Sequence, residues 1–87
     1  MQNQFKKQIF PILKEGLADF EKTAKDPFFT DSQTGAQLAI NALLNELRQK
    51  IETKDNWYYQ KEIDLSDGLR WVRKEAQKII DKLDLKP

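Results

Sequence analysis

The side chains best suited to chemistry in this sequence are aromatic and basic residues between positions 55 and 74. Exposed rings stack on nucleic-acid bases or fill pockets of a partner protein, and arginine or lysine pairs with phosphates and carboxylates. The segment DNWYYQKEIDLSDGLRW, residues 55–71, holds four of the nine aromatic residues of the chain. This clustering predicts a partner-binding surface made from seven residues: Trp57, Tyr58, Tyr59, Lys61, Arg70, Arg73 and Lys74.

The same rings have a plainer interpretation, because a small helical protein uses its largest side chains to close the open end of its core. In that case the tyrosine hydroxyls reach water while the rings pack inward. Trp71 adjoins Val72, a predicted core position, so we expect it to flank the core and be partly exposed. Trp57 and Tyr58 are therefore the better candidates for a surface contact.

Five basic residues that follow the aromatic segment could form a stripe on one helix: Arg70, Arg73, Lys74, Lys78 and Lys82. Acidic residues at positions 67, 75 and 81 lie three or four residues from several of them and reduce the local positive field. A solvated helix face is thus the simpler prediction for this stripe, and a phosphate-binding face is the alternative.

The residue types that most enzymes need are missing. The chain has no cysteine and no histidine, which removes thiolate and imidazole nucleophiles, bases and metal ligands. Glu15 and Asp19 share a helix face without apolar neighbours that would favour acid–base work, and DLSDG lacks the alternating oxygen ligands of a calcium loop. We therefore expect no enzyme activity, no metal and no cofactor.

The overall charge is nearly balanced, with 15 basic and 14 acidic residues among 87. This balance argues against both a strongly basic nucleic-acid coat and an acidic mimic of DNA. Lys14 and Glu15 interrupt the first apolar segment, so neither a signal peptide nor a membrane span is predicted. The expectation is one domain over residues 1–87, located in the cytoplasm and not bound to a membrane.

A first amphipathic helix is predicted to end near Ala24, where Asp26-Pro27 follows. Pro11 lacks the amide hydrogen that a helix interior needs, so a kink or a fresh start is expected there. Ile9 and Ile12 widen an apolar face whose main members recur at steps of three and four: Phe10, Leu13, Leu17, Phe20 and Ala24.

A second helix is predicted to start at a capping box, either Thr30 with Gln33 or Thr34 with Gln37. Gly16 on the first helix and Gly35 on the second are expected to mark helix crossings, because glycine admits a close neighbour. The apolar face of the second helix comprises six residues: Ala36, Ile40, Leu43, Leu44, Leu47 and Ile51.

A third helix is predicted to begin at a cap formed by Asp64 or Ser66. The aromatic-rich connection before it, residues 53–64, is predicted to be extended or irregular, with a helical turn as the alternative. Its apolar positions alternate steps of four and three: Leu65, Leu69, Val72, Ala76, Ile79 and Leu83. Three such stripes bury one another most simply in an all-α, up-and-down three-helix bundle.

The segment DPFFTDSQTGAQLAINALLNELRQKIE, residues 26–52, resembles short proteins encoded by phages and prophages, in which an aromatic turn leads into a Gly-Ala helix. The resemblance implies a compact protein that binds host or phage proteins, a class that includes inhibitors of bacterial defence such as anti-CRISPR proteins.

The leading functional hypothesis is a non-enzymatic protein-binding module, an inhibitor or adaptor, that presents residues 53–64 and an adjoining helix face. One alternative is a nucleic-acid binder that uses Arg70, Arg73, Lys74 and Lys78 together with Tyr58 or Trp57. The other alternative is a self-associating protein whose third helix pairs with a second copy.

Overall fold

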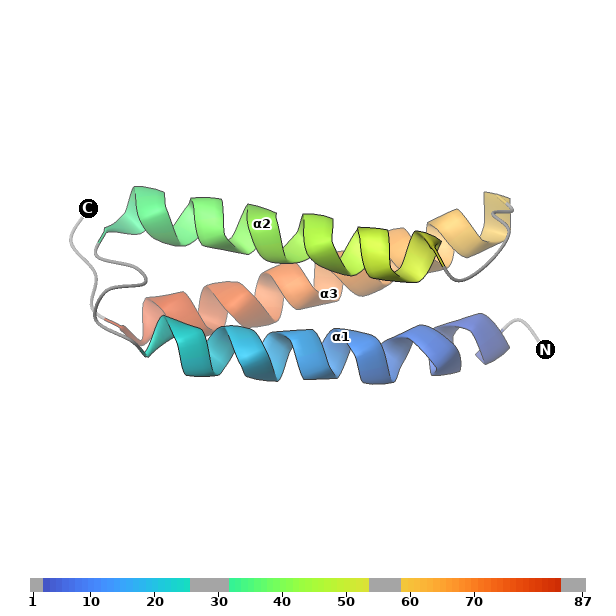
Figure 1. The fold of residues 1–87 in the computed structure, drawn as a ribbon, viewed down its shortest axis with the longest axis horizontal. Helices are drawn as coiled ribbons and strands as arrows, with labels where there is room; N and C mark the ends of the chain where they lie inside the picture. Colours follow the sequence, from blue (N-terminus) through green and yellow to red (C-terminus); the bar gives the residue numbers. More distant parts are fainter. Residues whose placement is uncertain (1–2, 26–31, 54–58, 84–87) are drawn as a thin grey trace.

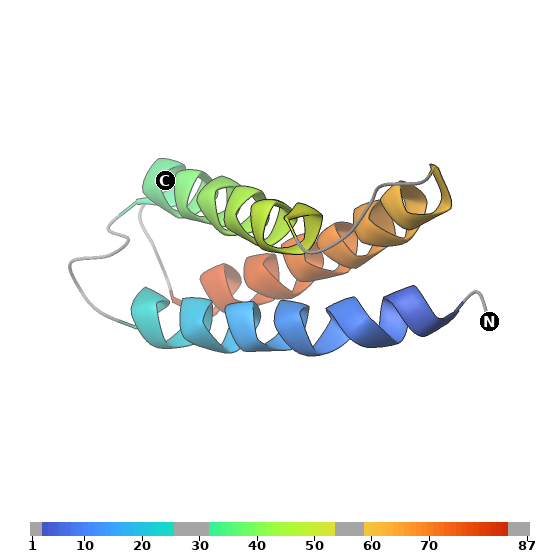
Figure 2. The same cartoon turned by 45° about the vertical axis from the view of Figure 1, so that its right-hand side comes forward.

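The chain folds into three helices that lie side by side in a rod-shaped bundle (Figure 1). The computed structural model describes residues 3–25, 32–53 and 59–83. Helix α1 spans Asn3–Ala24, α2 spans Gln33–Glu52 and α3 spans Tyr59–Asp81. The two views show that α2 runs antiparallel to both α1 and α3, so that α1 and α3 are parallel neighbours (Figures 1 and 2). The predicted all-α three-helix bundle is confirmed.

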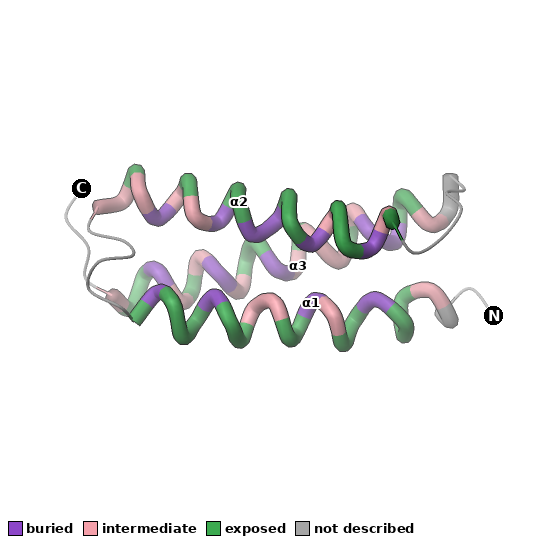
Figure 3. Tube along the Cα trace, in the orientation of Figure 1, coloured by how far each residue is buried: buried purple, intermediate pink, exposed green. Residues whose placement is uncertain are grey.

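The buried positions of each helix recur along the side that faces the other two helices (Figure 3). Helix α2 follows the sequence pattern completely, because the six residues predicted for its apolar face are the six that are buried. Burying these side chains supplies the main driving force that holds α2 against its neighbours. Its partners in the core include Leu13 and Phe20 of α1 and Leu65 and Val72 of α3.

Helix α1 continues through Pro11, so the fresh start predicted there is wrong, whereas the predicted kink stays a prediction. Pro11 is exposed, so water can solvate the carbonyl group one turn earlier that lacks a helical donor. The buried face of the helix also differs, because Ile9 is buried whereas Phe10 is 41% exposed. Neighbouring positions on a helix point about 100° apart, so placing Ile9 inside turns Phe10 toward the edge.

Ser32 caps the N-terminus of α2, and its hydroxyl oxygen accepts a hydrogen bond from the amide of Gly35 at 3.1 Å. Thr34 lies inside the helix and is not the cap, so that prediction is wrong, and Thr30 lies outside the described residues. Gly35 belongs to this N-terminal turn. Gly16 does mark a helix crossing, because a Cβ atom there would lie 2.6 Å from Cδ2 of Leu47.

Helix α3 begins at Tyr59, earlier than either predicted cap, so Asp64 and Ser66 lie within the helix. Residues 59–64, predicted as part of an irregular connection, are therefore helical, whereas residues 54–58 lie outside the described part of the chain. Further along α3, Ile80 is fully buried in place of the predicted Ile79, which is only partly buried. The core pattern thus shifts by one residue near the end of the helix.

Candidate functional site

Contacts between α1 and α3 bring together the polar and aromatic groups of the candidate site. Lys6 Nζ lies 3.6 Å from a carboxylate oxygen of Asp64. One turn further along, the ring centroids of Phe10 and Trp71 are 5.0 Å apart, with an angle of 39° between the ring planes. A Cβ atom at Gly68 would lie 2.6 Å from Cδ1 of Leu13, so the helices also approach closely between these pairs. The register of the parallel helices is therefore defined at several points.

Phe10, Pro11 and Trp71 form the surface that we call the aromatic patch. Phe10 is 41% exposed, and Trp71 packs against the core while remaining partly exposed. Lys6, Lys7, Phe10 and Pro11 line an open depression of about 430 Å³ beside the ring. An aromatic pair with one side in water is able to contribute apolar area to a partner.

Lysine side chains surround the aromatic patch. Lys14 Nζ lies 5.0 Å from the centroid of the Phe10 ring, within range of a cation–π interaction. Lys7 and Lys74 are also exposed, and no carboxylate of the described residues lies within ion-pair distance of them. The nearby carboxylates of α3, in contrast, each have a cation: Asp64 pairs with Lys6, Asp67 with Arg70 and Glu75 with Lys78.

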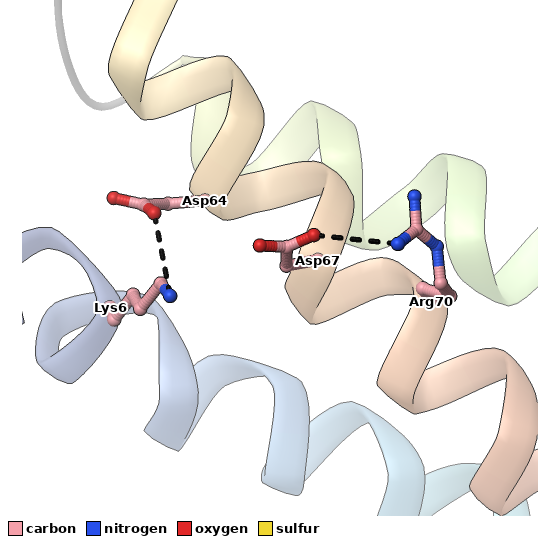
Figure 4. A network of polar contacts seen from close by, with 4 residues as sticks. All are labelled: Lys6, Asp64, Asp67 and Arg70. Atoms are coloured by element: carbon pink, nitrogen blue, oxygen red, sulfur yellow. Dashed lines mark ion pairs between the residues drawn. The ribbon is translucent and has the colours of Figure 1, made fainter.

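Asp64 is the only buried charged or polar residue in the described part of the chain, at 5% exposure (Figure 4). Its carboxylate points toward α1, whereas Asp67 on the same helix turns to Arg70 at 3.6 Å (Figure 4). A buried carboxylate is costly unless it is paired or hydrogen-bonded. The Lys6–Asp64 pair therefore fixes the N-terminal parts of α1 and α3 opposite each other.

Replacing Lys6 by methionine is expected to lower the free energy of unfolding by about 1 kcal/mol, because Asp64 loses its cation. The loss is well below that of a fully buried pair, since the Lys6 side chain is 49% exposed and water screens the interaction. Urea unfolding followed by circular dichroism measures the change. Lys7→Met is the matched control and should change stability by less than about 0.5 kcal/mol; equal losses for both variants would contradict the assigned role of Lys6.

The structure describes the side chains of four of the seven residues predicted to bind a partner: Lys61, Arg70, Arg73 and Lys74. Lys74 lies on the solvent-facing side of α3 near Trp71, whereas Arg73 donates a hydrogen bond to Oδ1 of Asn41 on α2 at 3.3 Å. Arg70 is exposed and pairs with Asp67, and Lys61 lies 5.6 Å from the centroid of the Phe5 ring. Tyr59 begins α3 without a described side chain, and Trp57 and Tyr58 lie outside the described residues.

The residues of the predicted basic stripe of α3 also differ in their contacts. Lys78 pairs with Glu75 at 3.4 Å, and Arg70 is held by Asp67, as the spacing of acidic residues led us to expect. Arg73 turns toward α2.

Phe10 and Pro11 belong to the exposed aromatic patch. The sequence pattern predicted Phe10 to lie in the core.

Among residues 3–25, 32–53 and 59–83, no group of three or more acidic side chains is arranged to hold a metal ion. No helix of these described segments combines the length and the apolar character that crossing a membrane requires. Comparison of the chain with protein-family models, curated proteins and solved structures found no match.

Proposed function

We propose that this protein is a non-enzymatic protein-binding module, an inhibitor or adaptor, and that it contacts its partner through the aromatic patch. The observation that carries the proposal is the Phe10–Trp71 pair, which lies at 5.0 Å on the α1–α3 edge with Phe10 41% exposed. Tryptophan and other large aromatic residues dominate the energetics of protein interfaces, because they bury much apolar area at a low entropic cost.

The lysines around the patch favour an acidic partner surface. Lys7, Lys14 and Lys74 lie at its rim, and the α3 carboxylates close to it are already paired with cations. A partner that places carboxylates around an apolar contact would meet complementary charge, which speeds association and selects against other partners. The resemblance to short phage-encoded proteins favours a host or phage protein in this role.

The test compares two variants that each replace an exposed apolar side chain by glutamate. Phe10→Glu places a negative charge within the patch, and Leu38→Glu places the same charge on α2, where Leu38 is 65% exposed. The wild-type protein and the two variants are each used to capture proteins from a lysate. We then purify a protein that wild type and Leu38→Glu capture but Phe10→Glu does not, and titrate it by calorimetry. We expect Phe10→Glu to weaken this reconstituted complex by at least about tenfold.

Circular dichroism establishes that both variants remain folded before binding is compared. Two results would contradict the proposal: equal affinities of the two variants for the purified partner, or a partner that wild type binds no more tightly than Phe10→Glu does. A partner without acidic residues at the contact would contradict the role given to the lysines.

A further inference from the structure

The groove between α2 and α3 is lined by three arginines, on the side of α3 opposite the α1 contact. Arg48 comes from α2, and Arg70 and Arg73 come from α3, so the antiparallel helices bring together cations that are distant in the sequence. Asn45 and Ser66 line the same open groove of about 420 Å³, together with the buried Leu44 and the partly buried Leu69. None of the residues that line it is acidic.

Each of these arginines has a partner that leaves most of its donors available. Arg48 Nη1 lies 2.8 Å from Oε1 of Glu52, and Arg70 Nη1 lies 3.6 Å from Oδ1 of Asp67. The Arg70–Asp67 pair is exposed and the Arg48–Glu52 pair is part-buried, and pairs of this kind within one helix add little to stability. A guanidinium group carries five N–H donors, so each arginine can donate to a further acceptor in the groove.

We propose that this groove binds a phosphate monoester group carried by a partner protein, such as phosphoserine or phosphothreonine. The planar guanidinium group donates two parallel hydrogen bonds to phosphate oxygens, and this geometry makes arginine the preferred residue for phosphate recognition. The Ser66 hydroxyl and the Asn45 amide supply neutral donors of the kind that complete such a site. The groove is separate from the aromatic patch, so the two proposals stand or fall independently.

The ends of the groove favour a compact phosphate over a nucleic-acid backbone. Glu52 lies one turn beyond Arg48 on α2, and Glu62 lies one turn before Ser66 on α3, so both carboxylates lie toward the same end. Toward the other end, the Gln77 side chain bonds to Gln37 at 2.7 Å and to the Asp81 carboxylate at 3.0 Å. A chain of phosphates along the groove would meet these acidic residues at both ends.

The test is an NMR titration of the full chain with four probes. These are an acetylated Ala-Ala-phosphoserine-Ala-Ala amide, the same peptide without phosphate, inorganic phosphate, and a single-stranded oligothymidine without terminal phosphates. We expect the phosphopeptide to bind most tightly and to shift the amide resonances that border the groove. The variant Arg48→Gln/Arg73→Gln should weaken its binding by about tenfold or more.

The control variant Lys22→Gln/Lys25→Gln removes the same formal charge from the end of α1 and should retain affinity within about twofold. If the arginine variant and the lysine variant lost affinity for the phosphopeptide equally, the proposal would be overturned, because the effect would come from net charge in general. Equal binding of the unphosphorylated peptide would also overturn it. Inorganic phosphate binding as tightly as the phosphopeptide would reject a protein-borne ligand, and tighter binding of the oligothymidine with a steep salt dependence would assign the groove to nucleic acid.

Discussion

Replacing Leu13 by alanine is expected to lower the free energy of unfolding by about 3–4 kcal/mol. Leu13 is fully buried, and its side chain fills the place where α1 approaches Gly68 of α3. Truncation removes buried apolar area and leaves a cavity that two packed helices only partly close. The total stability of a domain of this size is about 4–13 kcal/mol, so the loss is a large fraction of it. Urea unfolding at 25 °C, followed by circular dichroism, measures the change.

The matched control is Leu38→Ala, which makes the same chemical change on the outer face of α2. Leu38 is 65% exposed, so its truncation removes little buried area and favours the helix slightly through the propensity of alanine. We expect a change of less than about 0.5 kcal/mol. A Leu13→Ala loss close to that of Leu38→Ala would show that α1 and α3 do not pack as the structure describes.

The sequence is most informative for α2, where local pattern and tertiary packing agree. All of its large apolar residues except Leu38 form one stripe, and the opposite face carries Asn41, Asn45 and other polar side chains. The same six positions are buried in the bundle. Because the pattern of α2 favours one buried face, tertiary packing does not have to select between two faces.

In α1 and α3 the sequence offers two adjacent faces, and only packing selects between them. Ile9 and Phe10 are both apolar, and so are Ile79 and Ile80, so a step of one residue changes the predicted core. The bundle buries Ile9 and Ile80. Periodicity identifies a stripe to within about one position, whereas the neighbouring helix decides which of two adjacent apolar residues lies inside.

The start of α3 was missed because Asp64 resembles a cap. Aspartate before an apolar run is typical of an N-cap, but here its carboxylate pairs with Lys6 of α1 across the helix interface. That role depends on a residue far away in the sequence. The aromatic patch was missed for the same reason, since nothing local to Phe10 shows that Trp71 will lie against it.

Gly68 shows most directly how a single residue controls the approach of α1 to α3. A Cβ atom at this position would lie 2.6 Å from Cδ1 of Leu13 and 3.4 Å from Cδ1 of Ile9. Leucine is favoured over glycine in a helix by about 0.8 kcal/mol, so helix propensity alone predicts that Gly68→Leu stabilises the protein. The contact predicts the opposite sign, because a leucine side chain must displace two core residues or separate the helices.

We expect the contact to outweigh propensity and Gly68→Leu to lower the free energy of unfolding by about 2 kcal/mol. The double variant Leu13→Ala/Gly68→Leu provides the decisive comparison, because the new side chain can occupy the volume that Leu13 leaves. The double variant should lose less free energy of unfolding than the two single variants lose in sum, and the difference should be about 1–2 kcal/mol. Additive losses, or a stabilised Gly68→Leu protein, would contradict the close α1–α3 contact. The sign of this coupling therefore tests the helix register that also places Phe10 against Trp71 and Lys6 against Asp64.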